Sequence, residues 1–297
     1  MVGALLYFDV TTCEARRFSG LDNRKFNERS QALVGVESGR HADEGVDFAP
    51  RGEVMATAAE IKELKVKVAE ACRVLARLDL TREPAGHVSA RIPGTDRMLI
   101  KARGPGESGV RYTTPEDIVE ADMEGNIIGL PEGLASPREI FIHTWMYKKR
   151  PEIGSVIHIH PPMVVIFTVV NKPLLPIYGA YDPASLRLLL DGVPLYDKSL
   201  LVSNNELGEE LADAIGDKEV IMMRGHGVTA VGPDPAGAGI NVILLNEIAE
   251  MNYKARLLGE PRSISDQDIA SFKSAGRRTG AAGGGSAWET YRRMVDA

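Results

Sequence analysis

Cysteines, long apolar runs and surplus basic residues are all scarce in this 297-residue chain. The two cysteines, Cys13 and Cys72, fit neither a disulfide framework nor a metal-ligand spacing, which favours a reducing compartment, the cytoplasm. Apolar runs stay well below the ~20 residues of a membrane-spanning helix. The net charge of -6 provides no broad basic face for nucleic acid. We therefore expect a cytoplasmic protein that binds neither membranes nor nucleic acids.

Histidine is also rare, yet two of the six histidines stand close together. His158 and His160 lie in the apolar run Gly-Ser-Val-Ile-His-Ile-His, which predicts a strand ended by Pro161 and Pro162. Side chains two residues apart on a strand point to the same face, so the two imidazoles stand side by side. On this motif alone two interpretations stay open: hydrogen-bonded histidines at a strand end, or two ligands of one divalent cation.

A third histidine, His226, favours the metal. It lies in a Gly-His-Gly turn directly after the apolar segment 220–223, which predicts a buried strand. The flanking glycines permit positive φ and a close approach of the backbone to another group. Three histidines with further coordination positions left open are typical of a catalytic metal rather than a closed structural one.

A helix is predicted from Ser136 to Lys149, immediately before the histidine pair. Serine as N-cap, Pro137 at the first helical position and Glu139 three residues after the cap form a capping box. Two backbone hydrogen bonds at the helix start would fully explain Glu139. His143 lies four residues later on the same helix face, where a hydrogen-bonded core histidine is a commoner arrangement than a metal ligand.

Helical and strand patterns alternate along the chain, which predicts an α/β layered domain. We expect an N-terminal extension over residues 1–52, which contains His41 and has no sustained hydrophobic period. The catalytic domain is expected over 53–262. The C-terminal tail, 263–297, is expected to hold a flexible glycine-rich linker and a short amphipathic helix, which would cover an active site in one hypothesis.

Together, four motifs resemble the class II aldolase/adducin family over about residues 61 to 261. These motifs are Gly-His-Val-Ser-Ala-Arg at 86–91, Ser-Pro-Arg-Glu at 136–139, His-Ile-His at 158–160 and Arg-Gly-His-Gly at 224–227. The resemblance implies a three-layer α/β/α fold with a mostly antiparallel central sheet. It also implies a homotetramer with active sites at subunit boundaries.

The resemblance further implies one divalent metal ion per subunit, zinc, with manganese or cobalt as alternatives. By position, the implied metal ligands are His158, His160 and His226, and the implied catalytic acid/base is Glu139.

The chain departs from the family's sugar-phosphate aldolases at the positions that bind phosphate. His87 replaces the asparagine of their Gly-Asn-x-Ser loop, and Pro137-Arg138 replaces a pair of serines. Proline offers neither an N–H nor a hydroxyl, whereas arginine and histidine suit a carboxylate. The residues predicted to bind substrate are His87, Ser89, Arg138, Arg224 and Tyr178, with Tyr181 as a further candidate. Ordinary structural roles remain open for the histidine, the helix arginine and the tyrosines.

Gly-His-Val-Ser at 86–89 and Met-Arg-Gly-His-Gly at 223–227 resemble the decarboxylase branch of the family, whose members act on dihydroxyphthalates or carboxylated ring-cleavage products. We therefore predict a metal-dependent carbon–carbon lyase that removes a carboxyl group from a small hydroxylated aromatic or ring-cleaved carboxylate. One alternative is aldol-type cleavage of a non-phosphorylated hydroxy-keto compound. Another is an adducin-like interaction module without activity.

Overall fold

The computed structural model describes residues 55–82, 84–170, 172–275 and 281–296. The predicted N-terminal extension, residues 1–52, and His41 within it lie outside the described residues. All described residues fall within one structural unit, Gly52–Ala297.

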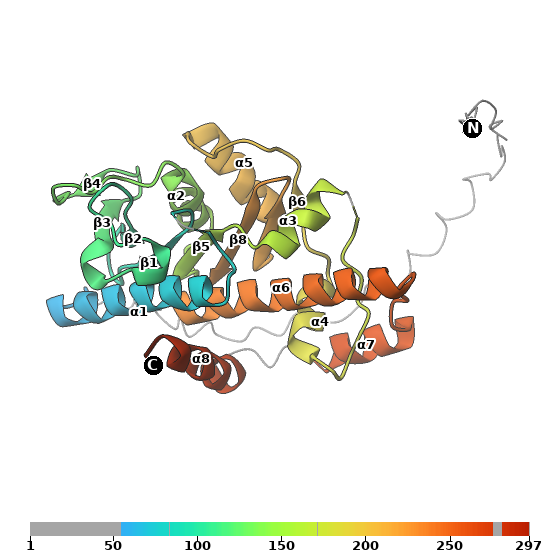
Figure 1. The fold of residues 1–297 in the computed structure, drawn as a ribbon. Coiled ribbons are helices and arrows are strands. Elements are labelled where there is room, and N and C mark those ends of the chain that lie inside the picture. Colours follow the sequence, from blue (N-terminus) through green and yellow to red (C-terminus); the bar gives the residue numbers. More distant parts are fainter. Residues whose placement is uncertain (1–54, 83, 171, 276–280, 297) are drawn as a thin grey trace, which may run out of the picture. The chain divides into compact units, whose positions relative to one another are not determined.

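An eight-stranded sheet forms the middle layer of this unit (Figure 1). Its strands lie in the order β4-β3-β2-β1-β5-β8-β7-β6, and every neighbouring pair is antiparallel except β6 with β7. The mostly antiparallel sheet predicted from the sequence is therefore confirmed. The strands are β1 (His87–Arg91), β2 (Arg97–Lys101), β3 (Ile118–Asp122), β4 (Ile127–Ile128), β5 (Ser155–Ile159), β6 (Leu195–Tyr196), β7 (Val220–Met223) and β8 (Gly227–Gly232).

Helices cover both faces of the sheet and give the predicted three layers (Figure 1). One core lies between the sheet and α1, α3, α6 and α8, and a second lies between the sheet and α2 and α5. The α-helices are α1 (Ala58–Arg77), α2 (Ile140–Lys149), α3 (Pro162–Val169), α4 (Pro183–Leu189), α5 (Asn205–Ile215), α6 (Pro235–Leu258), α7 (Asp266–Ser274) and α8 (Ala281–Asp296), and two short 3-10 helices span Val110–Tyr112 and Pro115–Asp117.

The first helix shows how sequence pattern becomes structure here. Thr57 caps α1 and forms a capping box with Glu60, and the buried residues of the helix recur on one face. Its outer face is charged.

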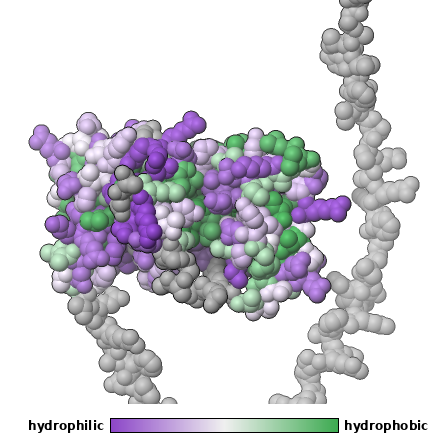
Figure 2. All heavy atoms as spheres, turned by 60° about the horizontal axis from the view of Figure 1, so that its bottom comes forward, coloured by the Kyte–Doolittle hydropathy of each residue, from purple (hydrophilic) through white to green (hydrophobic). Residues whose placement is uncertain are grey.

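Figure 2 shows hydrophilic and hydrophobic side chains interspersed over the face that lies at the bottom of Figure 1. Within the described ranges, no helix combines the length and apolarity needed to cross a membrane.

The alternation of side chains along β5 determines on which side of the sheet the histidine pair lies. Ile157 and Ile159 belong to the core beneath α1 and α6, whereas Val156 belongs to the core beneath α2 and α5. Because side chains alternate along a strand, His158 shares the face of Val156. The histidine pair is therefore placed in the layer covered by α2 and α5.

The C-terminal tail differs from the sequence prediction. Helix α7 was not predicted, and Ala281–Ser286 lie in α8 instead of a flexible linker, while Gly280 is outside the described residues. Trp288 anchors α8 by packing on Gly239 of α6 and by donating its indole N–H to Glu70 of α1 (3.0 Å). Extending an existing helix costs less free energy than nucleating a new one. This difference offsets the low helix propensity of the glycines. Since α8 covers the α1 and α6 layer, it does not cover the histidine pair of its own chain.

Candidate metal centre

The structure brings three histidines and one glutamate into a single cluster. Glu139 immediately precedes α2, His158 and His160 lie at the end of β5, and His226 lies in the turn between β7 and β8. One potential ligand atom from each of the four residues lies within 4.8 Å of the other three. Four residues singled out from the sequence therefore meet at one point.

The spacing of these atoms suits a divalent cation. Nε2 of His160 lies 3.0 Å from Nε2 of His158, and Oε2 of Glu139 lies 3.5 Å from Nε2 of both His158 and His226. Tetrahedral bonds of 2.0–2.1 Å to zinc would place two ligand atoms about 3.3 Å apart. The donor set therefore fits a metal with little rearrangement.

His226 provides a second sign of fit. Both of its ring nitrogens are buried and have no hydrogen-bond partner among the described residues. Burying a polar atom without a partner costs free energy, so such atoms usually serve a bound group. A cation held by His158, His160 and His226 would supply a partner for one of these two nitrogens.

The protonation states of the histidines also favour a metal. Burial lowers the pKa of His158. Burial and the neighbouring imidazoles of His158 and His226 lower the pKa of His160 to about 3. Neutral imidazole is the form that binds metals, so at neutral pH these side chains need not lose a proton first.

Two neighbouring residues hold the pair in place. Thr229 of β8 lies opposite His158 in the sheet, and its Oγ1 is 3.3 Å from Nδ1 of that histidine. Gly227 passes so close to the end of β5 that a Cβ there would lie 2.5 Å from Cδ2 of His160, and closer still to the carbonyl oxygen of Ile159. The glycine after His226 is thus required by close approach.

Gly227→Ala is expected to push His160 away and to weaken zinc binding at least ~10-fold, the loss typical when support of a metal ligand is removed. Competition with a fluorescent chelator measures the affinity. Gly192→Ala serves as the control for general destabilisation: a Cβ there meets nothing within 4 Å but is strained by the positive φ of 76°, so stability should fall while zinc affinity stays unchanged. Equal zinc affinity in the Gly227→Ala variant and the wild type would contradict the steric argument.

Glu139 corrects one prediction from the sequence. The capping box does not form: α2 begins at Ile140, and Glu139 is itself the N-cap residue, without a side-chain cap hydrogen bond. Its Oε1 instead accepts a hydrogen bond from the N–H of Val202 (2.9 Å), and its Oε2 faces the histidines. In the folded chain the carboxylate therefore interacts with the N–H of Val202 and with the histidines, which are stronger partners than the backbone at the helix start.

Glu139 is therefore a buried anion beside three imidazoles. Burial alone would raise the pKa of this carboxyl, but the imidazoles of His158 and His226 hold it well below its usual range. At neutral pH the group is therefore ionised.

Behind the cluster, a row of polar side chains connects β1 to α2. His87 lies opposite His158 in the β1–β5 pair, and its Nδ1 is 2.7 Å from Nε2 of His143. The other ring nitrogen of His143 is 2.7 Å from Oγ of Ser89, which is also 2.9 Å from the hydroxyl of Tyr147. His143 and Ser89 are fully buried, so His143 is a core histidine, as the commoner interpretation held.

Three other predicted substrate residues lie around or away from the cluster. Arg138 is exposed and precedes Glu139 directly. Arg224 pairs with Asp197. Tyr178 lies between α3 and α4 in the chain, contacts Tyr181 ring to ring at 5.3 Å and, within the described residues, makes no hydrogen bond to the histidine cluster. The structure therefore places His87 beside His158, whereas Arg138 adjoins Glu139 in the sequence and Tyr178 pairs with Tyr181.

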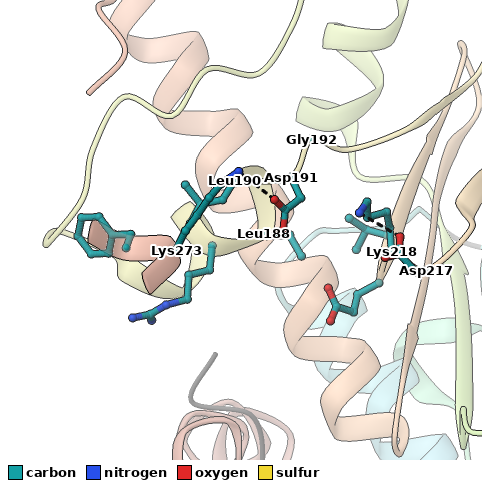
Figure 3. A pocket seen from close by; sticks show the side chains of 11 residues that line it. Leu188, Leu190, Asp191, Gly192, Asp217, Lys218 and Lys273 are labelled. Carbon is teal, nitrogen blue, oxygen red and sulfur yellow. Dashed lines mark ion pairs between the residues drawn. The ribbon is translucent and has the colours of Figure 1, made fainter. Parts of the chain in front are cut away.

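A separate cavity of about 320 Å³ lies between α4, α7 and the start of β7 (Figure 3). Val220 at this cavity begins β7, whereas His226 follows the end of that strand, so the cavity and the cluster lie at opposite ends of it. Four of its charged groups form two ion pairs, Lys273 with Asp191 and Lys218 with Asp217, each at 3.0 Å. The cavity is not part of the candidate metal centre.

Sequence reasoning missed Thr229, Tyr147 and Val202. Period-two alternation in β8 could have placed Thr229 beside the histidines, since its neighbours along the strand are apolar. The roles of the other two depend on contacts between distant segments, 58 residues apart for Ser89 and Tyr147 and 63 for Glu139 and Val202.

Comparison with known proteins agrees with this geometry. The family model for the class II aldolase and adducin N-terminal domain matches residues 66–253. The chain is 35% identical over 213 residues to a 3,4-dihydroxyphthalate decarboxylase of Arthrobacter keyseri, covering 70% of this chain and 86% of that protein. It is 36% identical over 197 residues to one of Rhodococcus jostii, covering 65% and 80%.

A solved structure extends the likeness to the fold. An aldolase II superfamily protein from Pseudomonas syringae superposes with a TM-score of 0.72 at 23% identity, covering 81% of this chain and 94% of that one. Sequence match, fold and the four-residue cluster agree, and the chain belongs to the class II aldolase and adducin family.

Proposed function

We propose that this protein is a divalent-metal-dependent carboxy-lyase that decarboxylates a hydroxylated aromatic carboxylate of the dihydroxyphthalate type. The observation that carries the proposal is the cluster of Glu139 with His158, His160 and His226. Similarity to 3,4-dihydroxyphthalate decarboxylases over most of their length supports the substrate class. The intact cluster argues against an inactive adducin-like module.

The three histidines hold the metal in this proposal, and zinc is the metal we propose, with manganese or cobalt as alternatives for the same donors. When bound, a divalent ion supplies Lewis acidity that stabilises negative charge on the substrate's phenolic oxygen. One ion per subunit accounts for the three imidazoles.

The chain's own residues account for binding and proton transfer. Arg138 and His87 bind the carboxylate that leaves, and Arg138 is exposed and has no ion-pair partner among the described residues. Glu139, ionised beside the histidines, accepts the proton of the substrate's phenolic hydroxyl. The bond between ring and carboxyl carbon then breaks, its electrons stay on the ring, and carbon dioxide departs. Glu139 returns the proton to that ring carbon, and water reprotonates the phenolate on release.

We further propose a cytoplasmic homotetramer whose active sites lie at subunit boundaries. Exposed apolar side chains support an interface close to the cluster: Val169 and Val170 are 56% and 53% exposed, and Val169 lies beside Gly225. Tyr178 and Arg224 are proposed to reach a substrate in the assembled protein.

Release of carbon dioxide from a panel of aromatic acids tests the proposed function. We expect zinc-loaded protein to decarboxylate 3,4-dihydroxyphthalate and to leave phthalate, which has no hydroxyl, unchanged. Excess chelator should stop the release, and added zinc should restore it. Metal-loaded protein that releases no carbon dioxide but yields aldehyde or ketone pairs from hydroxy-keto acids would replace the proposal with aldol-type cleavage.

A further inference from the structure

The buried row behind His87 has a direction, because each short contact in it needs one donor and one acceptor. Three contacts are short: 2.7 Å between His87 and His143, 2.7 Å between His143 and Ser89, and 2.9 Å between Ser89 and Tyr147. Ser89 is the decisive member, since its hydroxyl has a single proton and three potential acceptors.

Two of those acceptors are poor. Donation by Ser89 to the carbonyl of Val156 spans 3.4 Å, beyond the 2.5–3.0 Å usual for O–H···O bonds. Donation to the oxygen of Tyr147 would leave the phenolic proton of a residue that is 2% exposed without a partner among the described residues. Donation to Nδ1 of His143 satisfies both neighbours, with the Tyr147 hydroxyl donating to Oγ of Ser89.

The remaining protons follow from this choice. Burial lowers the pKa of His143 to about 3, so its ring is neutral and carries one proton. With Nδ1 accepting from Ser89, that proton sits on Nε2 and is donated to Nδ1 of His87. His87 must then carry its own proton on Nε2, which has no partner among the described residues.

We propose that Ser89, His143 and Tyr147 are positioning residues that fix the tautomer of His87 and make its Nε2–H a hydrogen-bond donor for a substrate oxyanion. His87 is only partly buried, and its ring lies 5.3 Å from the ring of His158, so the donor stands beside the metal centre. The oxyanion rests on the proposed function and is the carboxylate of the substrate. The tautomer depends only on the contacts above.

Solid-state ¹⁵N NMR of zinc-loaded protein with labelled histidine tests the tautomer without any activity. Spectra of His87→Asn identify the His87 signals by difference. We expect an unprotonated Nδ1 and a protonated Nε2 in the wild type, and an added Nδ1–H population in Ser89→Ala. A protonated Nδ1 in the wild type would overturn the proposal even if the enzyme proved to be a decarboxylase.

Kinetics test whether the row acts through His87. Ser89→Ala should raise KM roughly 3- to 10-fold with little change in kcat. This effect is smaller than the loss of a full charged hydrogen bond, because a bound substrate can still favour the His87 tautomer that carries its proton on Nε2. Thr113→Val is the control: Thr113 is also fully buried, its hydroxyl donates to the backbone carbonyl of Gly109 (2.9 Å), and none of its hydrogen bonds involves the row.

A double-mutant comparison separates positioning from loss of structure. Asparagine at position 87 keeps an N–H donor that needs no tautomer, so Ser89→Ala should change KM by less than about 2-fold in a His87→Asn background. The same KM increase in both backgrounds, or in Thr113→Val, would refute a role through His87.

Discussion

Replacing His158 by alanine is expected to lower zinc affinity by more than ~100-fold and to abolish turnover. Loss of a residue that only supports a ligand costs 10- to 100-fold in metal affinity, so loss of a ligand should cost more. His158 is fully buried, and its Nε2 is 3.0 Å from that of His160 and 3.5 Å from Oε2 of Glu139. Its removal leaves a cavity and two nitrogen ligands.

Metal content by mass spectrometry and zinc affinity by chelator competition measure this effect. The matched control is His143→Gln, since His143 is an equally buried histidine outside the cluster. The control should keep one zinc per chain. A His158→Ala protein that is folded and binds zinc as tightly as the wild type would exclude His158 as a ligand.

Glu139→Gln is expected to leave the metal in place and to lower kcat about 100- to 10,000-fold, the range for loss of a general acid–base group. Glutamine keeps the size of the side chain and can still accept the hydrogen bond from Val202. It cannot accept a proton and return it to carbon. The loss should therefore appear in kcat and not in zinc content.

Glu210→Gln is a suitable comparison, because Glu210 also pairs with neighbouring side chains, Tyr196 and Lys198, but lies outside the cluster. It should retain full turnover. If Glu139→Gln kept kcat within about 3-fold of the wild type, proton transfer would have to be assigned to another group.

The cluster of Glu139 with three histidines was largely predictable from the sequence, because its histidines carry strong local signals. Two residues of spacing on a strand put His158 and His160 on one face, and the period-two pattern also placed them opposite Ile157 and Ile159. Glycines on both sides of His226 marked a close approach, and the structure locates that approach at Gly227.

Glu139 shows where local reasoning fails. Serine, proline and glutamate at the right spacing predict a capping box, but the cap loses to the N–H of Val202 and to the histidines. These partners lie far away in the sequence and outweigh a cap worth on the order of 1 kcal/mol. The role of Ser89 was hidden for the same reason, since its partners His143 and Tyr147 become neighbours only when α2 packs on the sheet.

The tail shows the opposite error, in which composition predicted less order than the chain has. A run of glycines favours a linker, yet α8 extends through Ala281–Ser286 because Trp288 anchors the helix on α1 and α6. The packing of one tryptophan in the folded chain thus accompanies helical structure in a segment whose helix propensity alone is low.

Carbon dioxide release titrated with zinc is the most direct test of the central claim, that decarboxylation takes place at a metal held by the three histidines. Metal-free protein is mixed with 3,4-dihydroxyphthalate and increasing zinc, and the initial rate is recorded against zinc per chain. We predict a rate that rises to a plateau at one zinc per chain in the wild type and stays at background in His158→Ala. A rate that is independent of zinc, or equal in the two proteins, would contradict the account.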